Sequence, residues 1–122
     1  MKVSVVVITL NNIRTIRQVL NAVVDWADEI IVVDSGSTDE TVNIANAFGC
    51  KTSYRKFDGF GTQKRYAVDQ AKNDWIFIVD ADEVVTDALK NEINDVLQKT
   101  NYQGFMIPNT LVFFEWNYEI RT

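Results

Sequence analysis

The stretch WIFIVDADE, residues 75–83, runs from five consecutive apolar residues into three acidic residues within four positions. A run this apolar and this short predicts a strand buried on both faces, as in parallel sheets, whose ligands bind at the carboxyl edge. Asp80 and Asp82 are two positions apart, so an extended backbone would point both carboxylates the same way. A hard divalent cation would relieve their mutual repulsion. The stretch therefore predicts either a metal-binding edge or an ordinary acidic turn after a strand.

The composition fits a single globular domain over residues 1–122 that is large enough to bury a core. The net charge of −5 argues against nucleic acid as a partner. No apolar run approaches the roughly 20 residues of a membrane span, and the first strand follows Met1-Lys2 without room for a signal peptide. The single Cys50 fits a reducing compartment, and the absence of histidine leaves carboxylates as the main acid–base and metal-binding groups.

Strands and helices alternate along the chain. Apolar patterning predicts strands over residues 3–8, 29–34, 51–56, 75–79, 102–107 and 111–116, and helices over 13–24, 37–48, 62–72 and from 86. Asn12, Ser37 and Thr86 are the predicted helix N-caps, and Glu40 stands at capping-box spacing from Ser37. This order predicts an α/β fold with a Rossmann-like, mainly parallel sheet and helices on both faces.

Polar residues follow the first, second and fourth predicted strands, at positions 9–11, 34–37 and 80–82. If these strands are neighbours, the three groups share one crevice at the carboxyl edge. Asp34 would then accept a hydrogen bond from a base or ribose, or would simply start the Asp-Ser-Gly-Ser turn. Lys64 and Arg65 follow a loop with two glycines, and either could meet phosphate oxygens or merely face solvent.

Three motifs resemble the nucleotide-sugar-binding half of family 2 glycosyltransferases of the GT-A type. They are TLNN at residues 9–12, VVDSGSTDET at 32–41 and DADE at 80–83. In addition, GFGTQK at 59–64 is similar to a segment of bacterial enzymes that add sugars to the lipopolysaccharide core. The resemblance covers about residues 3–108, and it is specific to the superfamily rather than to one sugar.

The resemblance implies roles for these residues. Thr9 and Asn11 would line the nucleoside pocket, and Asp34 would hold the base or ribose. Asp82 would ligate Mn²⁺ or Mg²⁺ that bridges the donor diphosphate, with Asp80 near the ribose or the metal. The metal would offset the charge on the departing nucleoside diphosphate.

The reaction that the resemblance implies is a metal-assisted, inverting transfer from a nucleotide-diphosphate sugar, with a UDP-sugar as the first expectation. The acceptor would be a glycan or a lipopolysaccharide-core or other lipid-linked molecule. Such an enzyme would work in the cytoplasm, including the inner face of the cytoplasmic membrane. The alternative is a truncated nucleotide-sugar-binding module that binds its ligand without turnover.

Two departures from the family qualify this expectation. Arg65 stands where the family often has Asn. The family's catalytic domain is usually far longer, so residues 109–122 would begin an acceptor-binding half whose general base lies beyond Thr122. The acidic residues that we cannot assign as the base are Glu83, Glu115 and Glu119. We therefore expect the chain alone to transfer sugar poorly, and the apolar strand at 111–116 to promote self-association through an unpaired edge.

Two other enzyme or signalling folds fit the sequence less well. A phosphoacceptor receiver domain needs an acidic pair after its first strand, where this chain has residues 10–12, Leu-Asn-Asn. It also needs a lysine after the fifth strand, where Pro108 and Asn109 stand. A phosphatase of the Asp-x-Asp-x-Thr type needs its motif after the first strand. Here the motif follows the fourth, and Val84 holds the threonine position.

Overall fold

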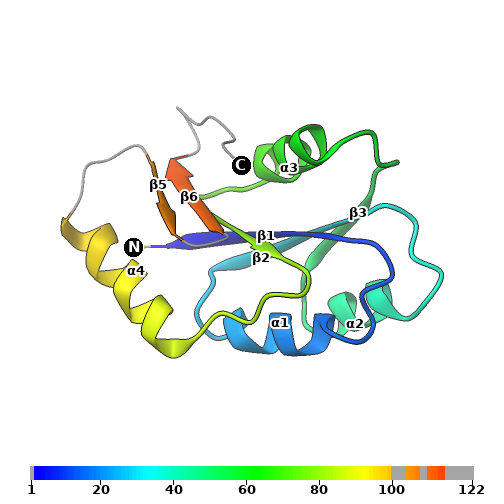
Figure 1. Ribbon diagram of the computed structural model, residues 1–122, viewed down its shortest axis with the longest axis horizontal. Helices are drawn as coiled ribbons and strands as arrows, with labels where there is room; N and C mark the ends of the chain where they lie inside the picture. Colours follow the sequence, from blue (N-terminus) through cyan, green and yellow to red (C-terminus); the bar gives the residue numbers. More distant parts are fainter. Residues whose placement is uncertain (1, 100–103, 108–109, 115–122) are drawn as a thin grey trace.

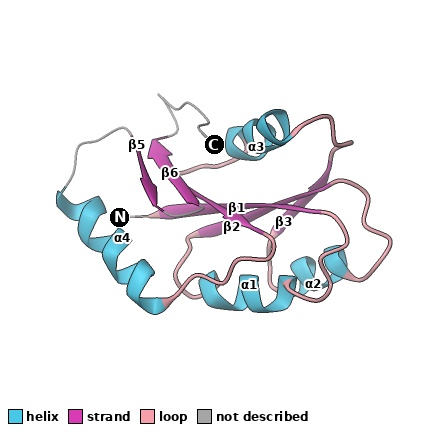
Figure 2. Cartoon of the chain, in the orientation of Figure 1, coloured by secondary structure: helices cyan, strands magenta, loops and turns pink. Residues whose placement is uncertain are grey.

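The computed structural model describes residues 2–99, 104–107 and 110–114 of the chain. The strands are β1 (Val3–Thr9), β2 (Glu29–Asp34), β3 (Lys51–Tyr54), β4 (Trp75–Asp80), β5 (Gly104–Ile107) and β6 (Thr110–Phe114). The helices are α1 (Ile16–Val23), α2 (Thr41–Ala47), α3 (Phe60–Asp69) and α4 (Asp87–Lys99). The described strands form one six-stranded sheet in the order β3-β2-β1-β4-β6-β5 (Figures 1 and 2).

The first four strands of the chain are parallel, as predicted. Val6 at the centre of β1 lies opposite Ile31 on β2 and Ile78 on β4. β3 extends the sheet beyond β2 in the same direction. β6 runs antiparallel to β4, and β5 runs antiparallel to β6. The sheet is therefore mainly parallel with an antiparallel pair at one side.

Helices cover both faces of the sheet (Figure 1). Val5 belongs to an apolar core with Leu20 on α1 and Ile93 on α4, whereas Val6 faces a second core with Ala67 on α3. The alternation follows from the two-residue period of a strand. The chain moves from β1 outward to β3 and then crosses back to β4, and right-handed crossovers in opposite directions place their helices on opposite faces.

Two of the three predicted helix caps are wrong. α1 begins after Thr15, and the Asn12 side chain instead accepts a hydrogen bond from the Leu10 N–H at 2.8 Å. α2 begins at Thr41, because the Ser37 hydroxyl is used for a hydrogen bond to the carboxylate that ends β2. Short polar side chains can serve turns as well as helix caps, and here contacts two and three residues away, within the adjoining turns, use the Asn12 and Ser37 side chains.

The third predicted cap is confirmed. The Thr86 hydroxyl accepts a hydrogen bond from the Leu89 N–H at 3.1 Å, just before α4. No tertiary partner competes for this hydroxyl in the described part of the chain, so the local preference prevails.

The unpaired edge expected for residues 111–116 is wrong over residues 111–114. β6 lies between β4 and β5 and is hydrogen-bonded to both, so the outer strands of the described sheet are β3 and β5. The side chains of 111–114, together with residues 115 and 116, lie outside the described part. None of the described helices is long and apolar enough to cross a membrane.

Candidate functional site

A pocket of about 480 Å³ opens at the carboxyl ends of β1 and β4. The chain leaves β1 toward β2 and β3 on one side and returns to β4 on the other, so this is the point where the strand order reverses. Open α/β sheets bind ligands at such a switch point, because the loops on its two sides diverge. The lining residues are Ile8, Thr9, Leu10, Asn12, Ser35, Phe57, Phe60, Lys64, Asp80, Ala81 and Asp82.

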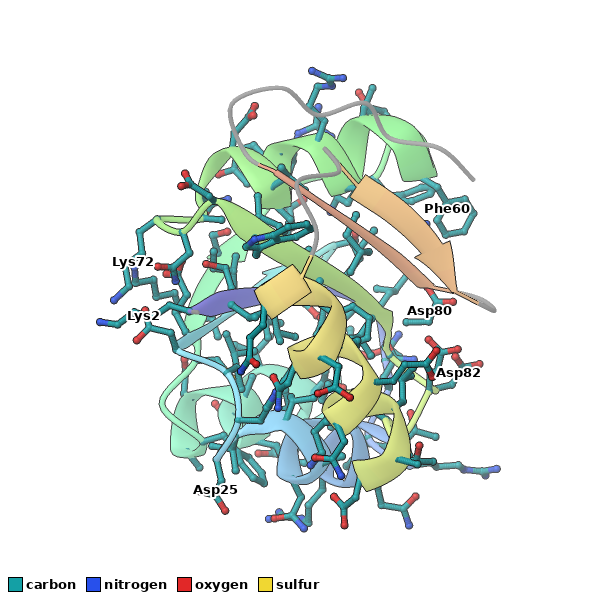
Figure 3. All side chains as sticks on the ribbon, turned by 90° about the vertical axis from the view of Figure 1, so that its left-hand side faces the viewer. Lys2, Asp25, Phe60, Lys72, Asp80 and Asp82 are labelled. Atoms are coloured by element: carbon teal, nitrogen blue, oxygen red, sulfur yellow. The ribbon has the colours of Figure 1, made fainter. Side chains whose placement is uncertain are left out.

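Asp80 and Asp82 are both exposed in this pocket, and they lie on the same side of the molecule as Phe60 (Figure 3). The turn that carries them is held in place. The Thr15 hydroxyl donates to the Ala81 carbonyl oxygen at 2.7 Å, and Asp80 closes the turn through its carbonyl oxygen. Within the described residues, however, neither carboxylate has a hydrogen-bond or ion-pair partner. The backbone is thus anchored while both carboxylates remain available to a ligand.

These two carboxylates suit a hard divalent cation that also contacts a ligand. Within the described part of the chain, no group of three or more His, Cys, Asp or Glu residues could enclose a metal. Mg²⁺ is commonly held by one or two carboxylates, with substrate phosphates and water completing its coordination. Carboxylate oxygens also suit Mn²⁺. Asp80 and Asp82 therefore fit an ion that shares a phosphate ligand, rather than an ion enclosed by protein alone.

Asp34, at the end of β2, is 4% exposed and does not line the pocket. Its Oδ1 accepts hydrogen bonds from the hydroxyls of Thr9 at 2.7 Å and Ser37 at 2.6 Å. Its Oδ2 accepts from the N–H groups of Gly36 at 2.9 Å and Ser37 at 2.7 Å. Burial alone would raise the pKa of Asp34, but these hydrogen bonds outweigh it and lower the pKa.

The Asp34 carboxylate therefore organises the loop after β2. Its four hydrogen bonds use about all the lone-pair positions of a carboxylate. Of the two roles considered for this residue, turn formation accounts for its contacts with Gly36 and Ser37, and the remaining contact joins it to Thr9 on β1. Direct contact with a nucleoside stays a prediction, and it would require one of these hydrogen bonds to be exchanged.

Asn11 joins the loops after β1 and β2 and also lies outside the pocket lining. Its N–H donates to the Ser37 hydroxyl at 2.8 Å, and its side-chain Oδ1 accepts from the Thr38 N–H at 2.8 Å. The backbone of Asn11 has a φ of 53°, a left-handed conformation that asparagine tolerates better than most residues. The neighbouring Asn12, rather than Asn11, reaches the pocket.

Of the predicted nucleotide and metal residues, the structure brings Thr9, Lys64, Asp80 and Asp82 together in the pocket. Lys64 is half-buried on α3 and is the cation among the described lining residues. Arg65, the next residue, is exposed and is not among the lining residues. The described lining thus combines two carboxylates that lack protein partners with one ammonium group.

Two aromatic residues of the pocket lining, Phe57 and Phe60, were not predicted from the sequence. The rings of Phe57 and Phe60 meet edge to face with centroids 5.0 Å apart, and Phe60 is 68% exposed. Leu10, also exposed, adds apolar surface to the lining. Two phenylalanines around Asp-Gly in a loop were an available signal, since large apolar side chains are more often buried. Exposed aromatic rings beside polar groups are typical of ligand pockets.

The comparisons with known proteins agree on one family. The model of the family described as "Glycosyl transferase family 2" matches residues 4–121. A protein of Rickettsia bellii described as an uncharacterised glycosyltransferase is 40% identical over 105 residues, which are 86% of this chain and 36% of that protein. The lipopolysaccharide core biosynthesis glycosyltransferase LpsC of Rhizobium meliloti is 34% identical over 74 residues, covering 57% of this chain and 27% of LpsC.

Solved structures give the same result for the fold. A crystal structure of Staphylococcus aureus TarS, residues 1–349, superposes with a TM-score of 0.70 and 29% identity over 80% of this chain and 33% of that one. Glucosyl-3-phosphoglycerate synthase of Mycobacterium tuberculosis, solved with Mn²⁺, UDP and glucosyl-3-phosphoglycerate, gives a TM-score of 0.57 and 30% identity over 66% of this chain and 33% of that chain.

The predicted fold is confirmed, because these structural neighbours are glycosyltransferases of the GT-A type. The chain spans about a third of the length of the relatives it matches. The family model nevertheless covers nearly all of it, including the strands, the loops and the acidic turn that form the pocket. The chain therefore belongs to glycosyl transferase family 2.

Proposed function

We propose that this chain binds the donor substrate of a sugar transfer, a nucleotide-diphosphate sugar, in the pocket between the ends of β1 and β4. The observation that carries the proposal is the pair of carboxylates on Asp80 and Asp82, held on an anchored turn without a described partner. In a member of glycosyl transferase family 2, that pair is best explained as the site of a divalent cation and a diphosphate.

UDP is the nucleoside diphosphate that we favour. The synthase from M. tuberculosis, which shares this fold, was solved with UDP together with Mn²⁺ and with Mg²⁺. In our proposal Asp82 ligates the metal, and Asp80 contacts the metal or the ribose. When bound, the ion would supply Lewis-acid stabilisation of the leaving diphosphate.

The other proposed contacts come from the chain itself. Lys64 would place its ammonium group near phosphate oxygens, where a point charge stabilises a diphosphate. Thr9, Asn11 and Asp34 would hold the nucleoside side of the ligand, either directly or through the hydrogen-bonded loops they form. Phe57 and Phe60 would exclude water from one side of the bound donor.

The acceptor and the stereochemistry extend the proposal further. Similarity to LpsC supports a lipopolysaccharide-core or other glycan acceptor, including a lipid-linked one. With such an acceptor, the protein would work in the cytoplasm at the inner face of the cytoplasmic membrane.

We propose inversion at the anomeric carbon, in which a carboxylate deprotonates the acceptor hydroxyl. Self-association through residues 111–116 remains part of the proposal, and it now rests on the apolar composition of that segment alone, because β6 is paired on both sides.

Calorimetric titration of the chain with UDP, with and without Mn²⁺, tests donor binding. We expect Mn²⁺ to increase UDP affinity, and Asp82→Ala to remove that increase. Asp25→Ala is the matched control, because Asp25 is an exposed aspartate outside the pocket lining (Figure 3). If Asp82→Ala leaves the Mn²⁺-dependent part of the affinity unchanged, the metal site is wrongly assigned.

One observation favours the second candidate, a module that binds donor without turnover. In the described lining of the pocket, the acidic residues are Asp80 and Asp82, and both are assigned to the donor side. No described acid is therefore left in the pocket to deprotonate an acceptor, which would forfeit about 10²–10⁴-fold in rate. Incubation with UDP-sugars and a lipopolysaccharide-core acceptor separates the two functions. Steady product formation by the chain alone would exclude the binding-only function.

A further inference from the structure

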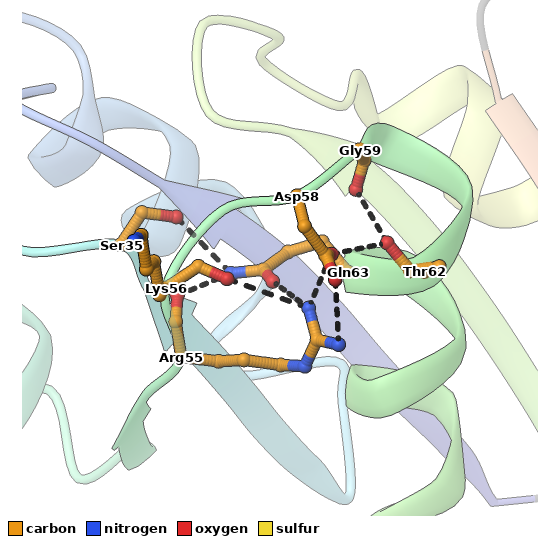
Figure 4. A network of polar contacts seen from close by, with 7 residues as sticks. All are labelled: Ser35, Arg55, Lys56, Asp58, Gly59, Thr62 and Gln63. Atoms are coloured by element: carbon orange, nitrogen blue, oxygen red, sulfur yellow. Dashed lines mark hydrogen bonds and ion pairs between the residues drawn. The ribbon is translucent and has the colours of Figure 1, made fainter.

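Gln63 on α3 is fully buried and makes three hydrogen bonds through its side-chain amide (Figure 4). Its Nε2 donates to the Ser35 hydroxyl oxygen and to the Arg55 carbonyl oxygen, each at 3.1 Å. Its Oε1 accepts from Nη1 of Arg55 at 3.1 Å. The amide therefore connects the loop after β2, the segment after β3 and the first turns of α3.

Gln63 does not line the pocket, but its neighbours and one of its partners do. Lys64 is the next residue along α3, Phe60 is one turn earlier, and Ser35 stands on the opposite loop. The hydrogen bond from Gln63 to Ser35 thus joins two walls of the pocket. A change in this contact would alter the separation between Lys64 and the loop after β2.

The segment before α3 is held together by its own polar contacts. Nη1 of Arg55 lies 2.8 Å from Oδ1 of Asp58, and the Thr62 hydroxyl donates to the same oxygen at 2.6 Å. The contacts of Arg55 and Thr62 lower the pKa of Asp58 to about 2. Asp58 therefore stays ionised, and its contacts hold Arg55 in place for its hydrogen bonds with Gln63.

A backbone hydrogen bond, from the Arg55 N–H to the Asp34 carbonyl oxygen at 3.0 Å, already attaches this segment to the end of β2. It fixes where the segment leaves the sheet. The Gln63 amide acts further along, where α3 carries Lys64 and Phe60 past Ser35. The two contacts restrain different parts of the pocket wall.

We propose that Gln63 is a positioning residue for nucleotide binding. Its hydrogen bonds keep Lys64 and Phe60, the two residues of α3 that line the pocket, at the distance from Ser35 that the bound nucleoside diphosphate requires. This inference rests on the proposed function, because it assigns Gln63 to the donor pocket. A purely structural role would make the same hydrogen bonds but would affect folding stability without affecting affinity in the folded protein.

The test is calorimetric titration of UDP at saturating Mn²⁺ with Gln63→Met, which keeps the length of the side chain and removes its hydrogen bonds. We expect UDP affinity to fall about five- to tenfold, the range for losing hydrogen bonds that orient a site. Gln70→Met is the matched control, since Gln70 is a partly exposed glutamine at the end of the same helix, and among the described residues its side chain hydrogen-bonds the Tyr66 carbonyl oxygen alone. Gln70→Met should leave the affinity unchanged.

A double-variant cycle with Ser35→Ala separates positioning from simple destabilisation. If Gln63 acts through Ser35, the double variant should bind UDP about as well as Gln63→Met alone, because contacting residues are not additive. Additive losses would overturn the proposed route. If Gln63→Met fails to fold, Gln63→Asn carries the test, since its shorter side chain cannot reach both partners.

The possible failures are distinguishable. If the unmodified chain does not bind UDP with Mn²⁺, the proposed function fails, and this inference fails with it. If the unmodified chain binds but Gln63→Met binds within about twofold of it, less than 0.5 kcal/mol, only the inference about Gln63 fails. A lower free energy of unfolding with unchanged affinity would show that Gln63 is purely structural.

Discussion

Glu29, at the amino end of the sheet, differs sharply from Asp80 and Asp82, at the carboxyl end, in the partners of its carboxylate. At the amino end, buried Glu29 accepts hydrogen bonds from the Ser4 hydroxyl at 2.5 Å, the Lys51 ammonium at 2.9 Å and the Lys72 N–H at 2.6 Å. At the carboxyl end, Asp80 and Asp82 have no such partners among the described residues. Lys72 and the two aspartates lie on opposite sides of the molecule in Figure 3.

This difference distinguishes the carboxylates that stabilise the fold from those that are available to a ligand. Burial alone would raise the pKa of Glu29, but the hydrogen bonds from Lys51, Ser4 and Lys72 outweigh it and lower the pKa. Removing a buried charge with this many partners is strongly destabilising, because those partners are left without their acceptor. Exposed carboxylates without partners contribute little to stability and remain free for a ligand.

The largest effect on stability is expected for Glu29→Ala. It leaves the Ser4 hydroxyl, the Lys72 N–H and the Lys51 ammonium without their acceptor, so the free energy of unfolding should fall by about 3 kcal/mol. Urea denaturation measures this loss. UDP affinity of the folded variant should be unchanged, because Glu29 lies at the end of the sheet opposite the pocket. A loss below about 0.5 kcal/mol would break the comparison.

Asp34→Ala should have the next largest effect, because Asp34 lies at the carboxyl end but is paired like Glu29. Loss of its four hydrogen bonds should cost about 2 kcal/mol in stability. UDP affinity should also fall about tenfold, equally with and without Mn²⁺, as the loop after β2 loses its organiser. Calorimetry and urea denaturation together test this. An affinity loss seen only with Mn²⁺ would instead make Asp34 a metal ligand.

A smaller effect is expected from acidification. The folded-state pKa of Glu29 is lowered, so its contribution to stability is complete above the unfolded value of about 4.3 and is lost as pH falls through the folded value. Stability of the unmodified chain should therefore decline below about pH 4.3, and Glu29→Gln should decline less steeply. Urea midpoints from pH 6 to about pH 3 measure both slopes. Equal slopes would mean that Glu29 does not contribute to acid sensitivity.

The smallest effect on stability is expected for Asp82→Asn. Its carboxylate has no described partner to lose, so the free energy of unfolding should change by less than about 0.5 kcal/mol. The same variant should lose the Mn²⁺-dependent gain in UDP affinity. Thermal unfolding without ligand, beside calorimetry with it, gives both quantities. A stability loss comparable to that of Glu29→Ala would show that Asp82 serves the fold after all.

Much of the fold could be predicted from local patterns. The strand at 29–34 has the predicted bounds, and the apolar run from Trp75 became the buried strand β4 beside β1. The grouping of Thr9, Asp80 and Asp82 at one edge was also predictable, because parallel strands bring their carboxyl ends together. Apolar periodicity and turn chemistry act over a few residues, so the chain itself carries that information.

Other features depended on partners far apart in the chain. The sequence allows Asp34 either a nucleoside contact or a role in the turn, but only the structure shows that Thr9, 25 positions earlier, and the loop that follows use its carboxylate. Gln63 had no predicted role beyond its place in the GFGTQK segment, yet it is fully buried and donates a hydrogen bond to Ser35, 28 positions away. β6 acquired two neighbours where an open edge was expected. The type of a residue determines which hydrogen bonds its side chain can donate or accept. The tertiary structure determines which partners lie close enough to form them.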